Sequence, residues 1–132
     1  MAKTPLVKKL GIKPKYKVKF INEPDNYLDL LGYLPEDVEI IESDTTDLDF
    51  IHIFTNKEAE LKQLFAKSKL EIKMNGMIWV SWYKKSAKKP TEIHRDIVRT
   101  IGLDMGLVDV KVCSVSEDWS GIKFMYRIKD RK

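Results

Sequence analysis

The pattern of apolar and polar residues along the chain predicts alternating strands and helices. Residues 16–21 alternate in polarity, whereas 48–54 form an almost continuous apolar run, which is typical of a strand buried on both faces. The stretch 74–85 begins with a predicted Asn75-Gly76 turn and continues as a run of β-branched and aromatic residues that ends in two lysines. We expect this run to be a central strand of a parallel sheet.

Helix signals separate these strands. A capping box at residues 55–58, followed by apolar residues at helical spacing, marks the clearest helix. Three further helices are predicted. A short one covers 6–10, with Thr4 and Pro5 at its start and Gly11 at its end, and one runs from Glu23-Pro24 to Gly32, with Tyr27, Leu28 and Leu31 facing inward. The third begins at Thr91 and ends at Gly102 or, as we prefer, at Gly106.

The remaining segments complete a sheet. Residues 38–42 are predicted to be a short strand, and 107–113 and 122–128 alternate on either side of a turn at 117–121, so they form an antiparallel pair. This succession predicts one domain over 1–132, an α/β three-layer sandwich with helices on both faces of the sheet.

One connection is unusually short for this topology. The link 43–47 reaches at most roughly 18 Å, although parallel crossovers normally take a dozen residues or more. Such a link would leave one face of the first strand without a helix, which would explain the alternation of Lys17 and Lys19. A hairpin between 38–42 and 48–54 is the competing topology, ranked second because 48–54 does not alternate.

Composition changes this picture little. An apolar content of 43% with 33% charged residues is ordinary for a globular protein. No run approaches the roughly 20 apolar residues of a membrane helix, and the first residues lack a signal-peptide core, so we expect a cytoplasmic protein. A single cysteine, Cys113, fits a reducing compartment.

Charge is unevenly distributed. Residues 1–20 contain seven lysines and no acid, and residues 21–50 contain ten acids and no lysine or arginine. The blocks could be a basic arm for nucleic acid beside an acidic site for a cation. We favour mutual neutralisation across neighbouring elements, because nearby acids weaken phosphate binding.

The sequence resembles two groups of proteins. The segments 48–54 and Lys73-Met-Asn-Gly-Met-Ile-Trp-Val-Ser, joined by a helix, look like the second half of the S-adenosylmethionine-dependent methyltransferase fold. This resemblance implies a Rossmann-like, mostly parallel six-stranded sheet of order 2-1-3-4-6-5 in chain numbering. Its C-terminal strand would be antiparallel, and one strand-helix unit would be missing after the second strand.

A closer resemblance is to a small, uncharacterised bacterial family called domain of unknown function three-zero-five-two. Five segments carry it: Lys9-Leu-Gly-Ile-Lys-Pro, Asn22-Glu-Pro, Trp79-Val-Ser-Trp-Tyr-Lys-Lys, Gly106-Leu-Val-Asp-Val-Lys-Val-Cys and Trp119-Ser-Gly-Ile-Lys-Phe. Tyr83 stands where the family pattern has Pro. The family name supplies no activity.

In doubly wound sheets, ligands bind beyond the carboxyl ends of strands where the strand order reverses, here between the first and third strands. The residues expected to line that site follow four strands: Asn22, Glu23, Tyr27, Glu42, Asp44, Thr55, Asn56, Trp82, Tyr83, Lys84 and Lys85.

The methyltransferase resemblance implies a glycine-rich loop after the first strand and an acid ending the second. Glu42 is placed for the acid, which would bind the ribose hydroxyls. The segment 20–26 contains no glycine, and its acids and Pro24 would crowd the adenosylmethionine tail. We therefore expect no cofactor, with adenosylmethionine the alternative.

Other chemistry is sparse. Two histidines and one cysteine on distant elements give no metal-ligand spacing. His52 is predicted to be a hydrogen-bonded core residue and His94 a surface residue, while Cys113 neither indicates nor excludes a nucleophile.

The three tryptophans are expected to lie in different environments. Trp79 and Trp82 should face opposite sides of the sheet, with Trp79 in the core. Trp82 belongs to an aromatic and basic patch that could stack a base or hold an anion, although a solvated loop is the favoured interpretation; the patch comprises Trp82, Tyr83, Lys84, Lys85, Lys88 and Lys89. Trp119 is better explained as a packing indole in a turn.

The sequence thus favours a non-catalytic domain that binds a small molecule or a protein. The alternatives are an enzyme that uses adenosylmethionine or a nucleotide, and a weak nucleic-acid binder that uses the Trp/Lys patch. We expect no membrane association, and either a monomer or a homodimer.

Overall fold

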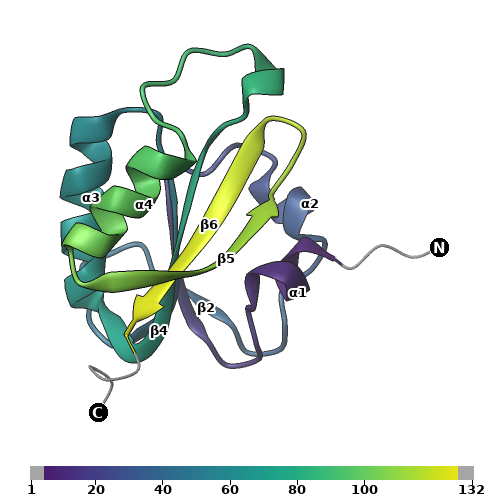
Figure 1. The fold of residues 1–132 in the computed structure, drawn as a ribbon. Helices are drawn as coiled ribbons and strands as arrows, with labels where there is room; N and C mark the ends of the chain where they lie inside the picture. The colour runs from purple at the N-terminus through teal and green to yellow at the C-terminus, as the bar shows by residue number, and fades with distance from the viewer. Residues whose placement is uncertain (1–4, 128–132) are drawn as a thin grey trace.

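The fold is a six-stranded sheet between two layers of helices (Figure 1). The computed structural model describes residues 5–127. In chain order the elements are α1 (Leu6–Leu10), β1 (Lys17–Ile21), α2 (Tyr27–Leu31), β2 (Glu39–Ile40), β3 (Leu48–Phe54), α3 (Glu58–Glu71), β4 (Ile72–Tyr83), the 3₁₀ turn η1 (Lys85–Ala87), α4 (Arg95–Asp104), β5 (Leu107–Ser114) and β6 (Trp119–Tyr126).

The strand order is β2-β1-β3-β4-β6-β5, which confirms the predicted fold class. Strands β2, β1, β3 and β4 run parallel, and β6 is antiparallel to both of its neighbours. Both β2 and β3 pair in parallel with β1, so the competing hairpin between 38–42 and 48–54 is wrong. No helix among residues 5–127 has the length and apolarity needed to cross a membrane.

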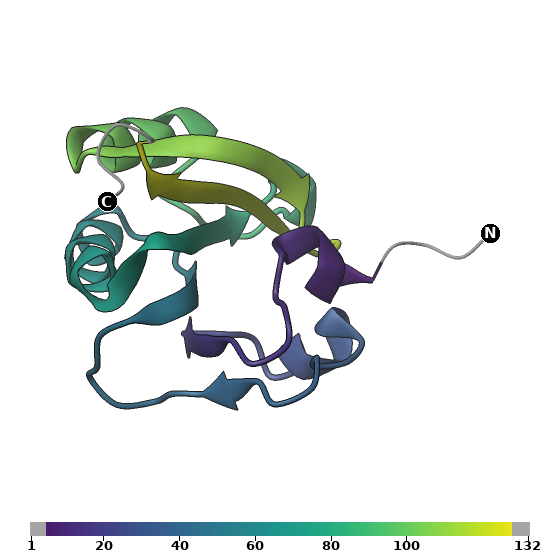
Figure 2. The ribbon, with the colours of Figure 1, turned by 90° about the horizontal axis from the view of Figure 1, so that it is seen from below.

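Helices cover both faces of the sheet (Figure 2), and each face has its own apolar core. Helices α3 and α4 pack against one face, where their buried residues include Leu61, Phe65, Val98 and Ile101. Helices α1 and α2 pack against the other face, which contains Phe50, Phe54 and Trp79. Trp79 and Trp82 belong to opposite cores, as the alternation predicted.

The Asn75-Gly76 turn is wrong, because both residues lie inside β4. Leu48 pairs with Ile72 and Phe50 pairs with Met77, so β4 has extra residues at this point of the ladder. A Cβ on Gly76 would lie 2.8 Å from the Leu48 carbonyl oxygen. Glycine is therefore required by a close approach of two backbones, not by a hairpin.

The helix ends differ from the prediction in several places. Helix α3 begins after Lys57 without a side-chain cap, so the capping box is wrong. Instead, Glu92 from a distant loop accepts a hydrogen bond from the Glu58 N–H at 3.1 Å. Helix α2 begins only at Tyr27, and Leu28 is 54% exposed, so the inward position expected for it is also wrong.

Other boundaries shift by a few residues. β2 retains only two of its five predicted residues, and α4 begins at Arg95. Helix α4 ends just before Gly106, which has a φ of +87°, as predicted. β6 begins at Trp119, so the predicted 117–121 turn is shorter, while Thr4 and residue 128 lie outside the described residues.

The short link 43–47 is accompanied by a buried ion pair. Lys19 is 7% exposed, and its Nζ lies 3.0 Å from Glu71 Oε1 at the end of α3. The Thr45 N–H donates to the same carboxylate at 3.2 Å, so Glu71 connects the link to β1. The expected exposed face at Lys19 is thus wrong, although Lys17 is exposed.

The two charged blocks meet on neighbouring strands, where Lys17 of β1 lies opposite Glu39 of β2. Within residues 5–127, one direct ion pair joins the blocks, between Lys19 and Asp44 at 4.0 Å. Mutual neutralisation of the remaining charges over longer distances stays a prediction.

His52 is a core residue, as predicted. It is fully buried, its Nδ1 lies 2.6 Å from the Tyr27 hydroxyl, and its Nε2 lies 2.7 Å from Ser81 Oγ. The Phe54 ring stacks on the imidazole at 4.1 Å between centroids. Burial lowers the pKa of His52 from 6.5 to about 3, because charge is disfavoured in this apolar layer.

We predict that Gly102→Ala destabilises the protein, although Ala normally stabilises a helix interior by about 1 kcal/mol. The added Cβ would lie 2.1 Å from Cε1 of Phe124, which is fully buried against Phe65. We expect a loss of roughly 1–3 kcal/mol in the free energy of unfolding, measured by urea denaturation. Thr100→Ala, at an exposed position of α4, is the matched control. An unchanged or more stable Gly102→Ala would contradict this packing.

We also predict that His52 makes the protein sensitive to mild acid. The unfolded chain takes up a proton on this imidazole below its ordinary pKa of 6.5, and the folded state does so only near 3. The contribution of the neutral imidazole to the free energy of unfolding is complete above pH 6.5 and is lost as the pH falls toward 3. From pH 7 to 5 this amounts to about 2 kcal/mol.

The measurement compares the free energy of unfolding at pH 7 and pH 5 for the wild type and His52→Gln, which cannot titrate. The variant is expected to be less stable at pH 7 and to lose about 2 kcal/mol less on acidification. His94→Gln removes the exposed histidine and should leave the wild-type difference intact. If His52→Gln loses as much stability between pH 7 and pH 5 as the wild type, the acid sensitivity does not come from His52.

Candidate functional site

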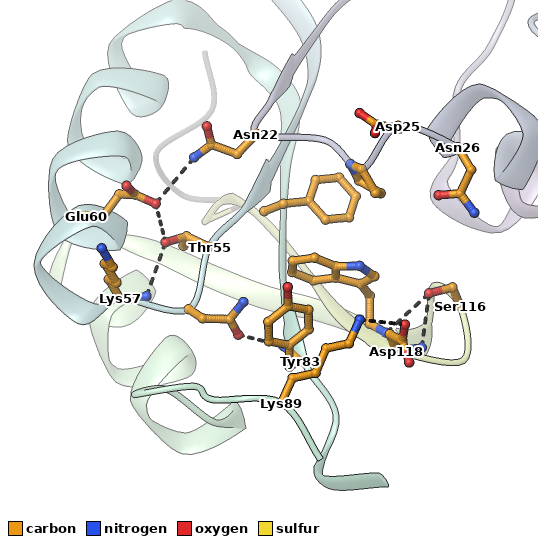
Figure 3. Close-up of a pocket in the computed structure, with 14 residues that line it drawn as sticks. Asn22, Asp25, Asn26, Thr55, Lys57, Glu60, Tyr83, Lys89, Ser116 and Asp118 are labelled. Carbon is orange, nitrogen blue, oxygen red and sulfur yellow. Dashed lines mark hydrogen bonds and ion pairs between the residues drawn. The ribbon is translucent and has the colours of Figure 1, made fainter. Parts of the chain in front are cut away.

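A hollow of about 680 Å³ opens at the carboxyl ends of β1, β3 and β4 (Figure 3). This is where the strand order reverses, so the topology and the cavity agree on the place. Fourteen residues line it: Asn22, Pro24, Asp25, Asn26, Phe54, Thr55, Asn56, Lys57, Glu60, Tyr83, Lys89, Ser116, Asp118 and Trp119.

One wall of the hollow is a polar network on Glu60 (Figure 3). Its Oε1 accepts hydrogen bonds from Asn22 Nδ2 at 3.3 Å and from Thr55 Oγ1 at 2.6 Å. Thr55 Oγ1 in turn accepts one from the Lys57 N–H at 3.3 Å. Asn22 has a φ of 58°, a left-handed conformation that Asn tolerates better than most residues. The network ties the end of β1 to the start of α3.

Asn56 anchors the neighbouring loop. Its Oδ1 accepts the Tyr83 N–H at 2.8 Å, and its backbone oxygen accepts the Glu92 N–H at 2.8 Å. The end of β4 and the loop that follows are thereby fixed against the end of β3. Asn56 is therefore a residue that positions the rim as well as a lining residue.

The opposite wall is aromatic. The Tyr83 and Trp119 rings lie 4.4 Å apart, and Phe54 meets Trp119 edge-on at 4.9 Å. Lys89 Nζ lies 5.2 Å from the centre of the Tyr83 ring and 3.1 Å from Asp118 Oδ2. These contacts place a cation, a carboxylate and an aromatic surface together.

The structure brings only some of the expected residues to this hollow. Asn22, Thr55, Asn56 and Tyr83 line it. The other expected residues, Glu23, Tyr27, Glu42, Asp44, Trp82, Lys84 and Lys85, lie elsewhere.

Four of those residues are turned into the core or out to solvent. Tyr27 is buried against His52, and the pKa of its hydroxyl is raised well above 10, first by burial and then by Glu23. Glu23, Glu42 and Asp44 are exposed. The pKa of Asp44 is lowered, chiefly by its hydrogen bond with Lys67. None of these four carboxyl or hydroxyl groups faces the hollow.

The predicted Trp/Lys patch is divided. Trp82 is 6% exposed and belongs to the core beneath α4, so it offers no free face to a base. Lys84 donates to Ser114 Oγ, and Lys89 pairs with Asp118. Trp82, Lys84 and Lys85, with Tyr83, line a second hollow of about 700 Å³ at the start of α4.

The sequence interpretation missed the wall that β6 contributes. Trp119 was expected to pack in a turn, yet it lines the hollow, and so do Asp118 and Ser116. Tyr83 pairs directly with Trp119 in the antiparallel ladder between β4 and β6. That register could have indicated the contact, but it depends on how far the strand extends toward the turn.

Side chains that bind metals or act as nucleophiles are sparse around the hollow. No group of three or more His, Cys, Asp or Glu side chains suited to a metal occurs within residues 5–127. Ser116 Oγ accepts the N–H groups of Asp118 and Trp119, both at 3.3 Å, and so belongs to a turn. Cys113 is half-buried, its thiol pKa is raised by burial, and it does not line the hollow.

Comparison with known proteins identifies the fold. No protein-family model and no curated protein matches the chain. A methyltransferase from Aquifex aeolicus that depends on S-adenosylmethionine superposes with a TM-score of 0.61 and 16% identity, over 92% of this chain and 88% of that one. A TehB-like methyltransferase from Corynebacterium glutamicum gives 0.61 and 12% identity, over 92% and 85%.

Fibrillarin from Aeropyrum pernix, solved with bound S-adenosyl-L-methionine, gives a TM-score of 0.60 and 10% identity, over 95% of this chain and 70% of that one. Identities this low carry information on the fold and not on activity. The chain therefore has the Rossmann-like fold of the S-adenosylmethionine-dependent methyltransferases.

Proposed function

We propose that this protein is a non-catalytic binding module whose small-molecule ligand occupies the hollow at the ends of β1, β3 and β4. The observation that carries the proposal is the convergence of an aromatic wall and a polar wall at the switch point of the sheet. A cleft of several hundred cubic ångströms with a few fixed polar groups is the usual form of a small-molecule site. Most lining polar groups are already hydrogen-bonded, so the site is largely preformed.

The residues after β1 argue against adenosylmethionine as the ligand. Pro24 lacks an N–H, its carbonyl is bonded to the Tyr27 N–H at 2.9 Å, and Asp25 adds a carboxylate at the rim. The side chain of Asn22, held by Glu60, stands where a glycine would let backbone approach a cofactor. Glu42, the expected ribose ligand, is exposed and does not line the hollow.

The polar groups of the hollow favour holding a ligand over transforming it. Thr55 donates to Glu60 and Ser116 accepts two backbone N–H groups, so both hydroxyls are committed to the protein. Among the described lining residues there is neither His nor Cys, the residues that most often act as base and nucleophile.

Membership of the family called domain of unknown function three-zero-five-two is also part of this proposal. It rests on the motifs at 79–85 and 119–124, with Tyr83 standing where the family pattern has Pro. A protein partner, a nucleic acid, or a second copy of the chain are the competing ligands.

A blocking variant tests the proposal. Thermal denaturation of the wild type is followed with amino acids, amines, nucleosides, nucleotides and adenosylmethionine, each at 1 mM. Asn26→Trp places an indole at the rim of the hollow, and we expect it to abolish any shift in melting temperature. Asp29→Trp, on the exposed side of α2 and outside the hollow, is the matched control and should retain the shift.

Two results would contradict the proposal. A shift that survives in Asn26→Trp would place the ligand elsewhere, and a shift confined to adenosylmethionine would favour an enzyme. If no compound shifts the wild type, a protein partner becomes the better explanation.

A further inference from the structure

We propose that the ligand of this hollow is a small organic cation, and that the ammonium group of Lys89 occupies its position in the free protein. This inference rests on the proposed function and specifies its ligand class. It is carried by two contacts of Lys89 with its surroundings, by the charge of the lining residues and by the segment on which Lys89 lies (Figure 3).

The first two contacts form a cation-binding arrangement. Lys89 Nζ lies 5.2 Å from the Tyr83 ring centre, within the range for attraction between a cation and the negative face of a ring. It also lies 3.1 Å from Asp118 Oδ2. An aromatic face combined with a carboxylate is how proteins bind alkylammonium groups, and Trp119, 4.4 Å from Tyr83, extends the aromatic surface.

The charge of the lining favours a cation once Lys89 leaves. Three carboxylates line the hollow, those of Asp25, Glu60 and Asp118, and Lys57 is the other lining cation. Displacement of Lys89 therefore leaves an excess of negative charge next to an aromatic wall. An anionic ligand would be repelled by this excess of negative charge.

The third observation is that Lys89 lies on an exposed segment with few backbone anchors. Residues 85–92 are exposed except for the half-exposed Ala87. Among the described backbone hydrogen bonds, this segment is anchored at its two ends, by the Lys84 N–H on the Asp118 oxygen and the Glu92 N–H on the Asn56 oxygen. Between them the bonds close only the local turn, and Lys88 has a φ of 54°, which is unfavourable for lysine.

A tethered ammonium competes with free ligand at an effective concentration of roughly millimolar or more. Removing it should therefore increase the affinity for a free ammonium ion. The probe is n-butylammonium chloride, which has the four-carbon stem and ammonium group of the lysine side chain. Binding is measured by isothermal calorimetry, and tryptophan fluorescence reports contact with Trp119.

We expect Lys89→Ala to bind n-butylammonium at least tenfold more tightly than the wild type. Lys88→Ala, which removes an adjacent exposed lysine that does not line the hollow, should behave as the wild type. Adding Asp118→Asn to Lys89→Ala should lower the affinity at least tenfold, and neutral n-butanol should not compete. The backbone oxygen that holds Lys84 is kept in that variant.

Equal affinities of Lys89→Ala and the wild type for n-butylammonium would overturn the inference, as would unchanged binding after Asp118→Asn. Circular dichroism and melting temperature show whether each variant is folded. If n-butylammonium fails these tests but an uncharged or anionic compound binds and is blocked by Asn26→Trp, the cationic ligand is rejected and the hollow is kept as the binding site. A failure of both experiments would reject the proposed function as well.

Discussion

The parallel pairing of β3 on both of its edges is the constraint on which the rest of the structure depends. Phe50 to Ile53 pair with β1 on one side, and Phe50 to Phe54 pair with β4 on the other, so the strand is enclosed by sheet and by two helical layers. Its side chains are buried except at Asp49, and the alternate faces supply both cores. Because β3 is fixed this firmly, the residues that follow it, Thr55 and Asn56, are held rigidly at the rim of the hollow.

Most buried polar side chains have a partner; among residues 5–127 the exception is the hydroxyl of Ser68, which is fully buried and makes no hydrogen bond. His52 is satisfied by Tyr27 and Ser81, and Lys19 is satisfied by Glu71. Removing one partner of a buried ion pair such as Lys19 and Glu71 costs several kcal/mol, because the other charge is left buried and unpaired. The contact is therefore specific although it adds little net stability. The Lys19 pair also accounts for the unusual link 43–47, since Glu71 binds both β1 and the backbone of Thr45. A charged contact thus accompanies the short connection where a longer crossover would carry a helix.

Sequence patterns predicted the sheet well because most of its strands are either apolar runs, as at 48–54, or alternate in polarity, as at 107–113 and 122–128. The order of the strands came from the resemblance to methyltransferases, and the parallel half followed from the run at 48–54. The failures have a common physical cause, which is a contact between distant segments. Gly76 looks like a turn residue but is required by the approach of Leu48, and the start of α3 is capped by Glu92 instead of by its own residues.

The same cause explains why the aromatic wall of the candidate site was predicted only at Tyr83. Asn22, Thr55 and Asn56 follow parallel strands, whose carboxyl ends must meet, so topology alone places them together. Trp119 and Asp118 arrive on an antiparallel strand, and their position depends on a register that pairs Tyr83 with Trp119. Register depends on the hydrophobic pattern and on turn geometry, and in this ladder Gly121 allows a close approach, because a Cβ there would lie 2.8 Å from Val115 Cγ2. Local propensity does not contain that information. The two walls of the hollow therefore have different origins: the polar wall lies where parallel strands end, whereas the rings of Tyr83 and Trp119 meet through the pairing of β6 with β4.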